Sequence, residues 1–130
     1  MNVAVATPDG YKPDGAVLEF TKGYGDKFAL ETDPFMAASG ADILITDTWT
    51  SMGEEAEKEE RKKIFKDYQI NRQLLAAANA GAMVQHCLPA YRGQEITEEV
   101  FEEHADEIFN EAENRLHAQK AVMVKLMKKD

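Results

Sequence analysis

The sequence contains little that would suit an oxidising compartment, a lipid bilayer or a polyanionic partner. Its 130 residues include one cysteine, so an internal disulfide is excluded and a cytoplasmic location is expected. No apolar run approaches the roughly 18 residues of a membrane-spanning helix, and no N-terminal signal peptide is recognised. Positive charge is also scarce, because 15 basic and 24 acidic side chains give a formal net charge of -9. That charge opposes binding to nucleic acid or to a membrane, and an anionic substrate would need its own local positive site.

Short apolar segments alternate with helical patterns along a chain long enough for one domain with one core. Four segments are predicted as strands, at residues 3–7, 28–31, 42–46 and 82–84. Residues 108–109 are predicted as a last short strand. Strands that alternate with helices at this spacing are typical of an α/β fold, a doubly wound parallel sheet flanked by helices.

Capping residues mark where helices are expected to begin. Asp14 is predicted to cap one helix, and Thr97 is predicted to cap another beyond the fourth strand. Asp33 followed by Pro34 is typical of an N-cap with proline at the first helical position. The last helix is predicted to start near residues 111–113.

The segment between the third and fourth strands is predicted to form two helices. Residues 54–65 are densely charged and are expected to form a solvated helix. Three ion pairs are expected along it at i,i+4 spacing: Glu54–Lys58, Glu57–Arg61 and Glu59–Lys63. The second helix is expected to end at Gly81, with an inward face made of Ile70, Leu74, Leu75 and Ala78.

Two loops carry the residues of most chemical interest. Asp47 directly follows the third predicted strand, and Cys87 follows the fourth. Ligands of open α/β sheets bind outside the carboxyl ends of the strands, so neighbouring strands would place both side chains in one crevice. A carboxylate there can bind an ammonium group, and a thiol beside it can hold or deprotonate an amine. The alternatives are a capping or turn aspartate and a cysteine that is a small buried hydrophobe.

A third candidate is Arg115, predicted to lie in the first turn of the last helix, where an anion can bind. The alternative is an ion pair with Glu111 or Glu113. The three histidines have no zinc-ligand spacing with the cysteine, so no metal site is expected. A hydrolase triad and a glycine-rich phosphate loop are not recognised either.

Three segments resemble signatures of the ornithine carbamoyltransferase family. They are residues 47–53 (Asp-Thr-Trp-Thr-Ser-Met-Gly), 86–89 (His-Cys-Leu-Pro) and 111–120 (Glu-Ala-Glu-Asn-Arg-Leu-His-Ala-Gln-Lys). Residues 3–11 resemble the opening of the same family's ornithine domain, so the resemblance covers essentially the whole chain. Aspartate carbamoyltransferases differ by a proline where Cys87 stands.

The resemblance implies an enzyme that transfers a carbamoyl group from carbamoyl phosphate to the δ-amine of ornithine, giving citrulline for arginine biosynthesis. The implied substrate-binding residues are Asp47, Ser51, Met52, Cys87, Leu88 and Arg115. Three of them are implied to be catalytic: Asp47, Cys87 and Arg115.

Within this scheme Asp47 binds the α-ammonium of ornithine, and Cys87 lies beside the δ-amine. The carbonyls of Cys87 and Leu88 accept hydrogen bonds from the substrates, and Arg115 reaches carbamoyl phosphate. The bond from Leu88 to Pro89 is cis in this family. No cofactor or metal is expected.

The resemblance also marks what the chain does not contain. Members of the family are about twice as long, and their first domain carries a Ser-x-Arg-Thr phosphate cradle. Residues 1–130 would form a single truncated ornithine-binding domain that lacks the family domain's first strand and helix and is inactive alone. The missing strand would lie mid-sheet, so a homodimer is expected, with exchange of the last helix or a strand as one route. Alternatively, strands 3–7 and 42–46 close the gap by pairing directly.

Two other function classes remain open. The chain can be a non-catalytic amino-acid-binding module or a purely structural fragment. It can also be half of a related carbamoyltransferase that acts on putrescine or acetylornithine.

Overall fold

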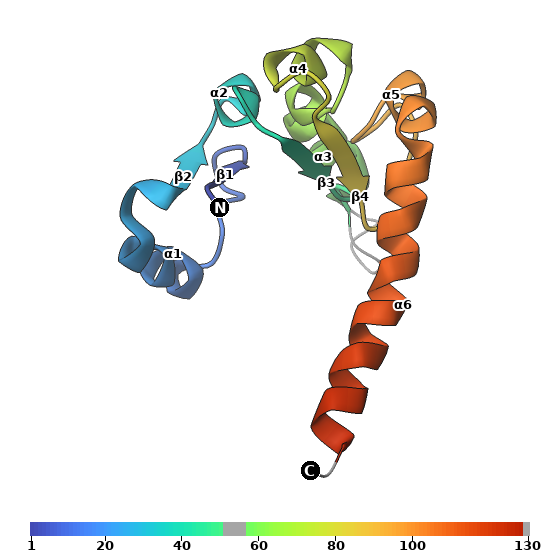
Figure 1. Ribbon diagram of the computed structural model, residues 1–130. Coiled ribbons are helices and arrows are strands. Elements are labelled where there is room, and N and C mark those ends of the chain that lie inside the picture. Colours follow the sequence, from blue (N-terminus) through green and yellow to red (C-terminus); the bar gives the residue numbers. More distant parts are fainter. Residues whose placement is uncertain (51–56, 129–130) are drawn as a thin grey trace.

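Helices flank two small parallel sheets in the computed structural model, which describes residues 1–50 and 57–128 (Figure 1). Strand β1 (Val3–Ala6) pairs with β2 (Phe28–Glu31), and β3 (Ile43–Thr46) pairs with β4 (Met83–His86). Both pairs are parallel, so the α/β class with parallel strands flanked by helices is confirmed. The strands form two two-stranded sheets rather than one continuous sheet.

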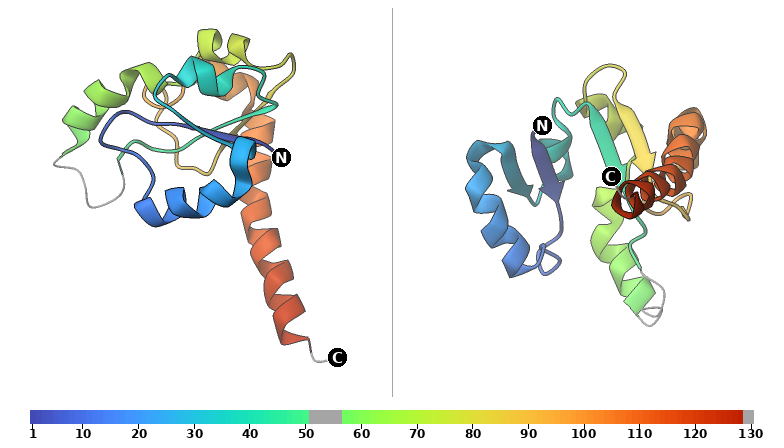
Figure 2. Two further views of the ribbon diagram at one scale, coloured as in Figure 1. Left: turned by 90° about the vertical axis from the view of Figure 1, so that its left-hand side faces the viewer. Right: turned by 60° about the horizontal axis from the view of Figure 1, so that its bottom comes forward.

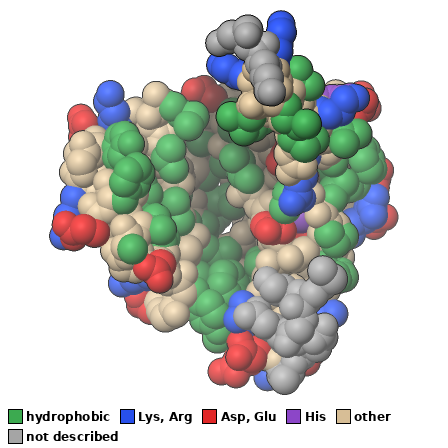
Figure 3. Space-filling model, turned by 90° about the horizontal axis from the view of Figure 1, so that it is seen from below, with side chains coloured by type: hydrophobic (Ala, Val, Ile, Leu, Met, Phe, Trp, Pro, Cys, Tyr) green, Lys and Arg blue, Asp and Glu red, His purple; other side chains and the backbone are tan. Residues whose placement is uncertain are grey.

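The gap between the two sheets lies between β1 and β3. The two strands face each other in both Figure 1 and Figure 2, yet β1 is bonded in a ladder only to β2 among the described residues. Direct pairing of these strands, the alternative left open by the sequence, is therefore wrong. Seen from below, the surface is hollowed between the two sheets, and hydrophobic side chains gather around the hollow (Figure 3).

Most of the helices predicted from capping residues begin where expected. The Asp14 and Asp33 carboxylates accept from the backbone at the starts of α1 (Gly15–Thr21) and α2 (Pro34–Ala38). Thr97 likewise caps α5 (Glu98–Glu103). A 3-10 segment, η1 (Lys22–Lys27), joins α1 to β2.

The charged segment is helical over α3 (Lys58–Phe65), followed by η3 (Lys66–Tyr68) and α4 (Arg72–Ala77). The Glu57–Arg61 ion pair is confirmed at 3.0 Å. Glu59 pairs with Lys62 at 2.9 Å, one residue short of the predicted partner. The predicted pair between Glu54 and Lys58 involves a residue outside the described part of the chain.

Ile70 is buried as predicted, but it precedes α4 instead of lying on it. It forms a parallel bridge with Ile96, and this bridge ties the segment before α4 to the loop after β4. The residues on either side of Ile70, Gln69 and Asn71, have extended backbones, so the helix is interrupted there. Ile70 is buried because it contacts Ile96, which is distant in the chain.

The predicted last strand at residues 108–109 is wrong. These residues lie in the long helix α6 (Ala105–Met127), whose start near 111–113 was therefore also predicted too late. Asp106 and Glu107 occupy its first turn, where acidic side chains suit the helix dipole. Across the described residues, α6 included, the structure holds no helix with both the length and the apolar character needed to cross a membrane.

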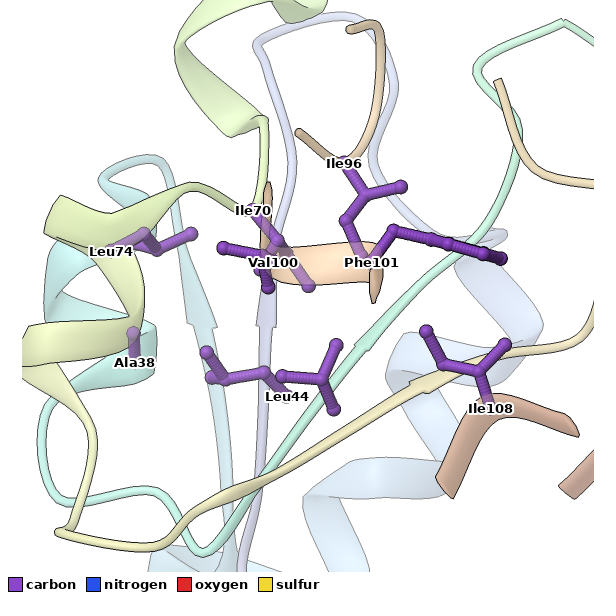
Figure 4. Close-up of a cluster of buried hydrophobic side chains, with 9 residues drawn as sticks. Ala38, Leu44, Ile70, Leu74, Ile96, Val100, Phe101 and Ile108 are labelled. Atoms are coloured by element: carbon purple, nitrogen blue, oxygen red, sulfur yellow. The ribbon is translucent and has the colours of Figure 1, made fainter. Parts of the chain in front are cut away.

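The hydrophobic core lies around β3 and β4 rather than around β1 (Figure 4). Its buried members come from α2, β3, β4, α4, α5, α6 and the loops between them: Ala38, Leu44, Ile70, Leu74, Val84, Ile96, Val100, Phe101 and Ile108. No residue of α1 or η1 is buried. The two strands that precede the candidate loops are thus the best-packed strands of the described chain.

An aromatic cluster joins the β1–β2 region to the core region. The Phe65 ring lies 4.8 Å from Tyr11, 5.9 Å from Tyr68 and 6.1 Å from Trp49 between centroids. The Tyr68 hydroxyl donates to the Thr32 carbonyl, which directly follows β2. These contacts connect the residue after β2, the loop after β1 and the loop after β3.

Candidate functional site

The register of β3 and β4 brings the two candidate loops together. Thr46 pairs with His86, so Asp47 and Cys87 are each the first residue beyond a paired strand end. The side-chain oxygen of Asp47, a ring nitrogen of His86 and the thiol of Cys87 all lie within 4.8 Å of one another. The convergence expected from the strand ends is present in the structure.

The Cys87 thiol is held in its protonated form. Partial burial raises the pKa of Cys87, and the hydrogen bond to the Asp47 carboxylate raises it further. The charges of Asp47 and Glu111 add to this rise. At neutral pH the group is therefore a neutral thiol beside the Asp47 carboxylate and not a reactive thiolate.

Removal of the Asp47 charge is expected to shift the pH profile of Cys87 alkylation. With iodoacetamide, the midpoint of the parent chain should lie above the ordinary thiol range, and Asp47→Asn should move it to lower pH because the acceptor and the negative charge are lost. The folded thiol keeps its proton to higher pH than the unfolded thiol does. The free energy of unfolding should therefore fall as the pH rises from the pKa of the unfolded thiol through that of the folded thiol.

The matched control for this profile is Glu111→Gln. It removes the charge of Glu111, which is the smallest of the causes that raise the pKa of Cys87. It should move the midpoint in the same direction by a smaller amount. A midpoint that is the same in Asp47→Asn and in the parent chain would contradict the contact between the two loops.

His86 is fully buried, and both of its ring nitrogens are engaged. Nδ1 accepts the Leu88 backbone N–H at 2.9 Å, so Nε2 carries the ring proton and donates to Glu95 at 3.1 Å. The histidine therefore has a structural role beneath the loop, because neither ring nitrogen is free to bind a ligand.

Glu95 was not found from the sequence. It is one of 24 acidic residues, lies in a polar loop nine residues beyond His86, and has no motif around it. In the structure its side chain is fully buried. Only the tertiary contact with His86 distinguishes it from the exposed glutamates nearby.

The backbone after Cys87 has an unusual conformation. Leu88 has φ of 55°, in the left-handed region that costs a branched residue roughly 1 kcal/mol or more. The bond from Leu88 to Pro89 is cis, as the family resemblance implies. The hydrogen bond from Leu88 N to His86 stabilises this turn.

Arg115 does not lie in the first turn of its helix, which was the basis of its predicted anion site. Helix α6 begins ten residues earlier, at Ala105, and Arg115 is an exposed residue near the middle of this helix. Within residues 57–128 the alternative pair of Arg115 with Glu111 or Glu113 is not formed either: Glu113 contacts His117 at 3.1 Å, and Oε2 of Glu111 is buried without a hydrogen-bond partner. The assignment of Arg115 now rests on the motif alone. Ser51 and Met52, the other two predicted binding residues, lie outside the described part of the chain.

The side chains of Asp47, His86 and Cys87 are close enough for a metal ion, but the donor set does not suit one. Each ring nitrogen of His86 already makes a hydrogen bond, to Leu88 or to Glu95. A metal would have to break one of these bonds and remove the proton from a thiol whose pKa is raised.

The family model described as aspartate/ornithine carbamoyltransferase, Asp/Orn binding domain, matches residues 1–126. The chain belongs to this carbamoyltransferase family. The resemblance seen in its sequence motifs is thereby confirmed, and both candidate loops fall inside the matched range.

Individual carbamoyltransferases are similar to this chain over nearly all of its length. The ornithine carbamoyltransferase of Nitratiruptor sp. is 54% identical over 129 residues, which are 96% of this chain and 42% of the relative. That of Gloeobacter violaceus is 55% identical over 131 residues, 98% of this chain and 42% of the relative. The chain thus spans about two fifths of the length of these curated relatives.

Solved carbamoyltransferase structures share the fold. The anabolic ornithine carbamoyltransferase of Campylobacter jejuni superposes with a TM-score of 0.90 at 45% identity, covering 96% of this chain and 43% of that one. The ornithine carbamoyltransferase of Pyrococcus furiosus gives 0.81 at 46% identity, covering 95% of this chain and 41% of that one.

Proposed function

We propose that this chain is the ornithine-binding part of an ornithine carbamoyltransferase that serves arginine biosynthesis in the cytoplasm. The observation that carries the proposal is the meeting of Asp47 and Cys87 at the carboxyl ends of β3 and β4. A carboxylate and a neutral thiol side by side suit the two amino groups of a diamino acid. The similarity of the chain to named ornithine carbamoyltransferases supports the same assignment.

In the proposed reaction, the δ-amine of ornithine attacks the carbamoyl carbon of carbamoyl phosphate. The new C–N bond forms as the C–O bond to phosphate breaks, the bonding electron pair leaves with the phosphate, and the phosphate takes up the proton that the amine gives up. Asp47 binds the α-ammonium, while the carbonyls of Cys87 and Leu88 orient the reacting groups. Positioning two substrates in attack geometry supplies much of the rate.

The proposed role of Cys87 follows from its partial burial and its neutral state. A neutral thiol, unlike a thiolate, adds no negative charge that would favour the ammonium form of the δ-amine beside it, and Cys87 is proposed, with Asp47, to help hold that amine deprotonated for attack. Ser51 and Met52 are proposed to complete the ornithine site from the loop that begins at Asp47. Arg115 is proposed to bind carbamoyl phosphate, and neither a metal nor a cofactor takes part.

Isothermal calorimetry with three ligands tests this assignment. Ornithine should release heat on binding to the chain. N-acetylornithine should bind much more weakly because its α-nitrogen carries no charge for Asp47, and putrescine should bind more weakly because it lacks the α-carboxylate. Equal binding of putrescine would favour the related transferases. An absence of heat with all three would favour a structural fragment.

We further propose that the 130 residues alone do not catalyse carbamoyl transfer. Two acidic groups, Asp47 and Glu111, lie around Cys87 and give the described site a negative field, which disfavours an anionic acyl phosphate such as carbamoyl phosphate. The charge-assisted contacts of a phosphate cradle are worth about 1.5–3 kcal/mol each, so loss of several of them would weaken the binding of carbamoyl phosphate by many orders of magnitude. An assay with radiolabelled carbamoyl phosphate should give no citrulline above background, and measurable citrulline would overturn this part of the proposal.

We also propose that a second copy of the chain covers the exposed apolar side of α6. The distal half of this helix extends away from the core (Figure 1), and Leu126 is 80% exposed. Other exposed apolar residues lie along the same half: Leu116, Val122, Met123, Val124 and Met127. Such a surface is typical of an interface. Sedimentation velocity should show a dimer that Val122→Glu with Leu126→Glu converts to monomer, whereas a monomeric parent chain at high concentration would exclude the dimer.

A further inference from the structure

Glu95 is a buried carboxylate that receives two hydrogen bonds on one oxygen. Oε1 accepts from Nε2 of His86 at 3.1 Å and from the backbone N–H of Tyr91 at 2.5 Å. The other oxygen, Oε2, is buried without a partner among the described residues. Burial of a carboxylate is costly, and within the described residues the cost is offset by bonds from His86, the last residue of β4, and from Tyr91 in the loop that follows.

The carboxylate is held by the core and not by the loop it contacts. The next residue, Ile96, is fully buried and bridges to Ile70. The Ile70 N–H donates to the Glu95 carbonyl at 2.9 Å, and Thr97 N–H donates back to the Ile70 carbonyl at 3.0 Å. Glu95 thus projects from a fixed backbone toward the end of β4.

The bonds form a continuous chain from Glu95 to the candidate site. Glu95 holds the proton of His86 on Nε2, so Nδ1 remains free to accept from Leu88 N. Cys87 lies between these two anchored residues, with Leu88 in its left-handed conformation. The bond from Tyr91 N fixes the far end of the same loop to the same oxygen.

We propose that Glu95 is a positioning residue, which fixes the His86 tautomer and thereby holds residues 87–91 so that the Cys87 thiol contacts Asp47. Its consequence for ornithine rests on the proposed function, but its effect on the loop does not. A glutamine at this position can still accept both bonds through its amide oxygen, whereas a leucine cannot accept either.

The test compares Glu95→Leu with Glu95→Gln as the matched control. In the parent chain, long-range ¹⁵N–¹H spectra should show His86 protonated on Nε2, with the signal assigned by its loss in His86→Gln. Glu95→Gln should keep this tautomer, while Glu95→Leu should lose it. Alkylation of Cys87 at pH 8 should be severalfold faster in Glu95→Leu, because loss of the contact with Asp47 lowers the thiol pKa and increases the thiolate fraction.

A role confined to stability predicts a different outcome. A folded Glu95→Leu chain with His86 still protonated on Nε2 and Cys87 alkylated at the parent rate would overturn the proposal. If Glu95→Leu does not fold, His86→Gln and His86→Asn decide, because glutamine can keep the donor to Glu95 but loses the acceptor for Leu88 N, whereas asparagine keeps an acceptor at the position of Nδ1. Faster alkylation in His86→Gln than in His86→Asn supports the proposal, and the parent rate in His86→Gln overturns it.

Both readouts are independent of ornithine, so they remain valid if the proposed function fails. If ornithine does bind, its affinity should fall about tenfold in Glu95→Leu and stay within about threefold in Glu95→Gln, following the loss or retention of the loop geometry. An unchanged ornithine affinity in a folded Glu95→Leu chain with an altered His86 would overturn the link between the loop and binding.

Discussion

Replacement of Ile108 by alanine is expected to lower the free energy of unfolding by about 3 kcal/mol. The side chain is fully buried in the core cluster, on the face of α6 that packs against β4. Its removal loses apolar burial and leaves a cavity between two elements fixed by other contacts. One of these contacts is the bond from Val84 N to the Glu107 carboxylate at 2.8 Å, so the helix is not free to close the space.

Urea denaturation followed by circular dichroism measures this effect. The matched control is Leu116→Ala on the same helix, where the side chain is 61% exposed and the change should stay within about 0.5 kcal/mol. Both variants should be measured at protein concentrations too low for the chain to associate, because Leu116 lies on the proposed interface. Similar losses at both positions would contradict the packing of α6 through Ile108.

Replacement of Asp47 by asparagine is expected to raise the dissociation constant of ornithine about 10- to 100-fold, the equivalent of about 1.5–3 kcal/mol. The change keeps the size of the side chain and its ability to accept from Thr48 N, a bond of 2.7 Å. It removes the charge that the proposed α-ammonium requires. The loss should therefore appear in binding and not in folding.

Calorimetry with ornithine measures the loss, and Asp26→Asn is the control for the change in net charge. Asp26 is exposed in η1, which joins α1 to β2 and so belongs to the part of the chain around the β1–β2 sheet. In Figure 2 this part lies apart from β3 and β4. Its replacement should leave ornithine affinity unchanged. Unaltered affinity in Asp47→Asn would remove the carboxylate from the binding site and with it the main support for ornithine as the ligand.

Local chemistry in the sequence was enough to predict the strands, most helix starts and the two candidate loops. Short apolar segments ended by turn residues marked the strands. Asp14, Asp33 and Thr97 marked helix starts through single backbone hydrogen bonds. Parallel strands end at one edge of a sheet, so Asp47 and Cys87 were expected to meet if their strands were neighbours, and the pairing of β3 with β4 supplies that condition.

Features that depend on remote partners could not be predicted in this way. Residues 108–109 are too short an apolar run to show a helical or a strand period, and only packing of α6 on β4 decided between them. The position of Arg115 changed with the start of that helix. The separation of the two sheets also follows from tertiary contacts, because no local pattern reports which strands become neighbours.

The sequence by itself determined where the strands end and which side chains follow them, because these depend on residues a few positions apart. Only the tertiary structure decided that Glu95 lies under His86, that the ring proton is on Nε2 and that the thiol stays protonated. Burial and charge at these groups are set by elements that are distant in the chain, and a buried carboxylate is stable only where such elements supply its hydrogen bonds.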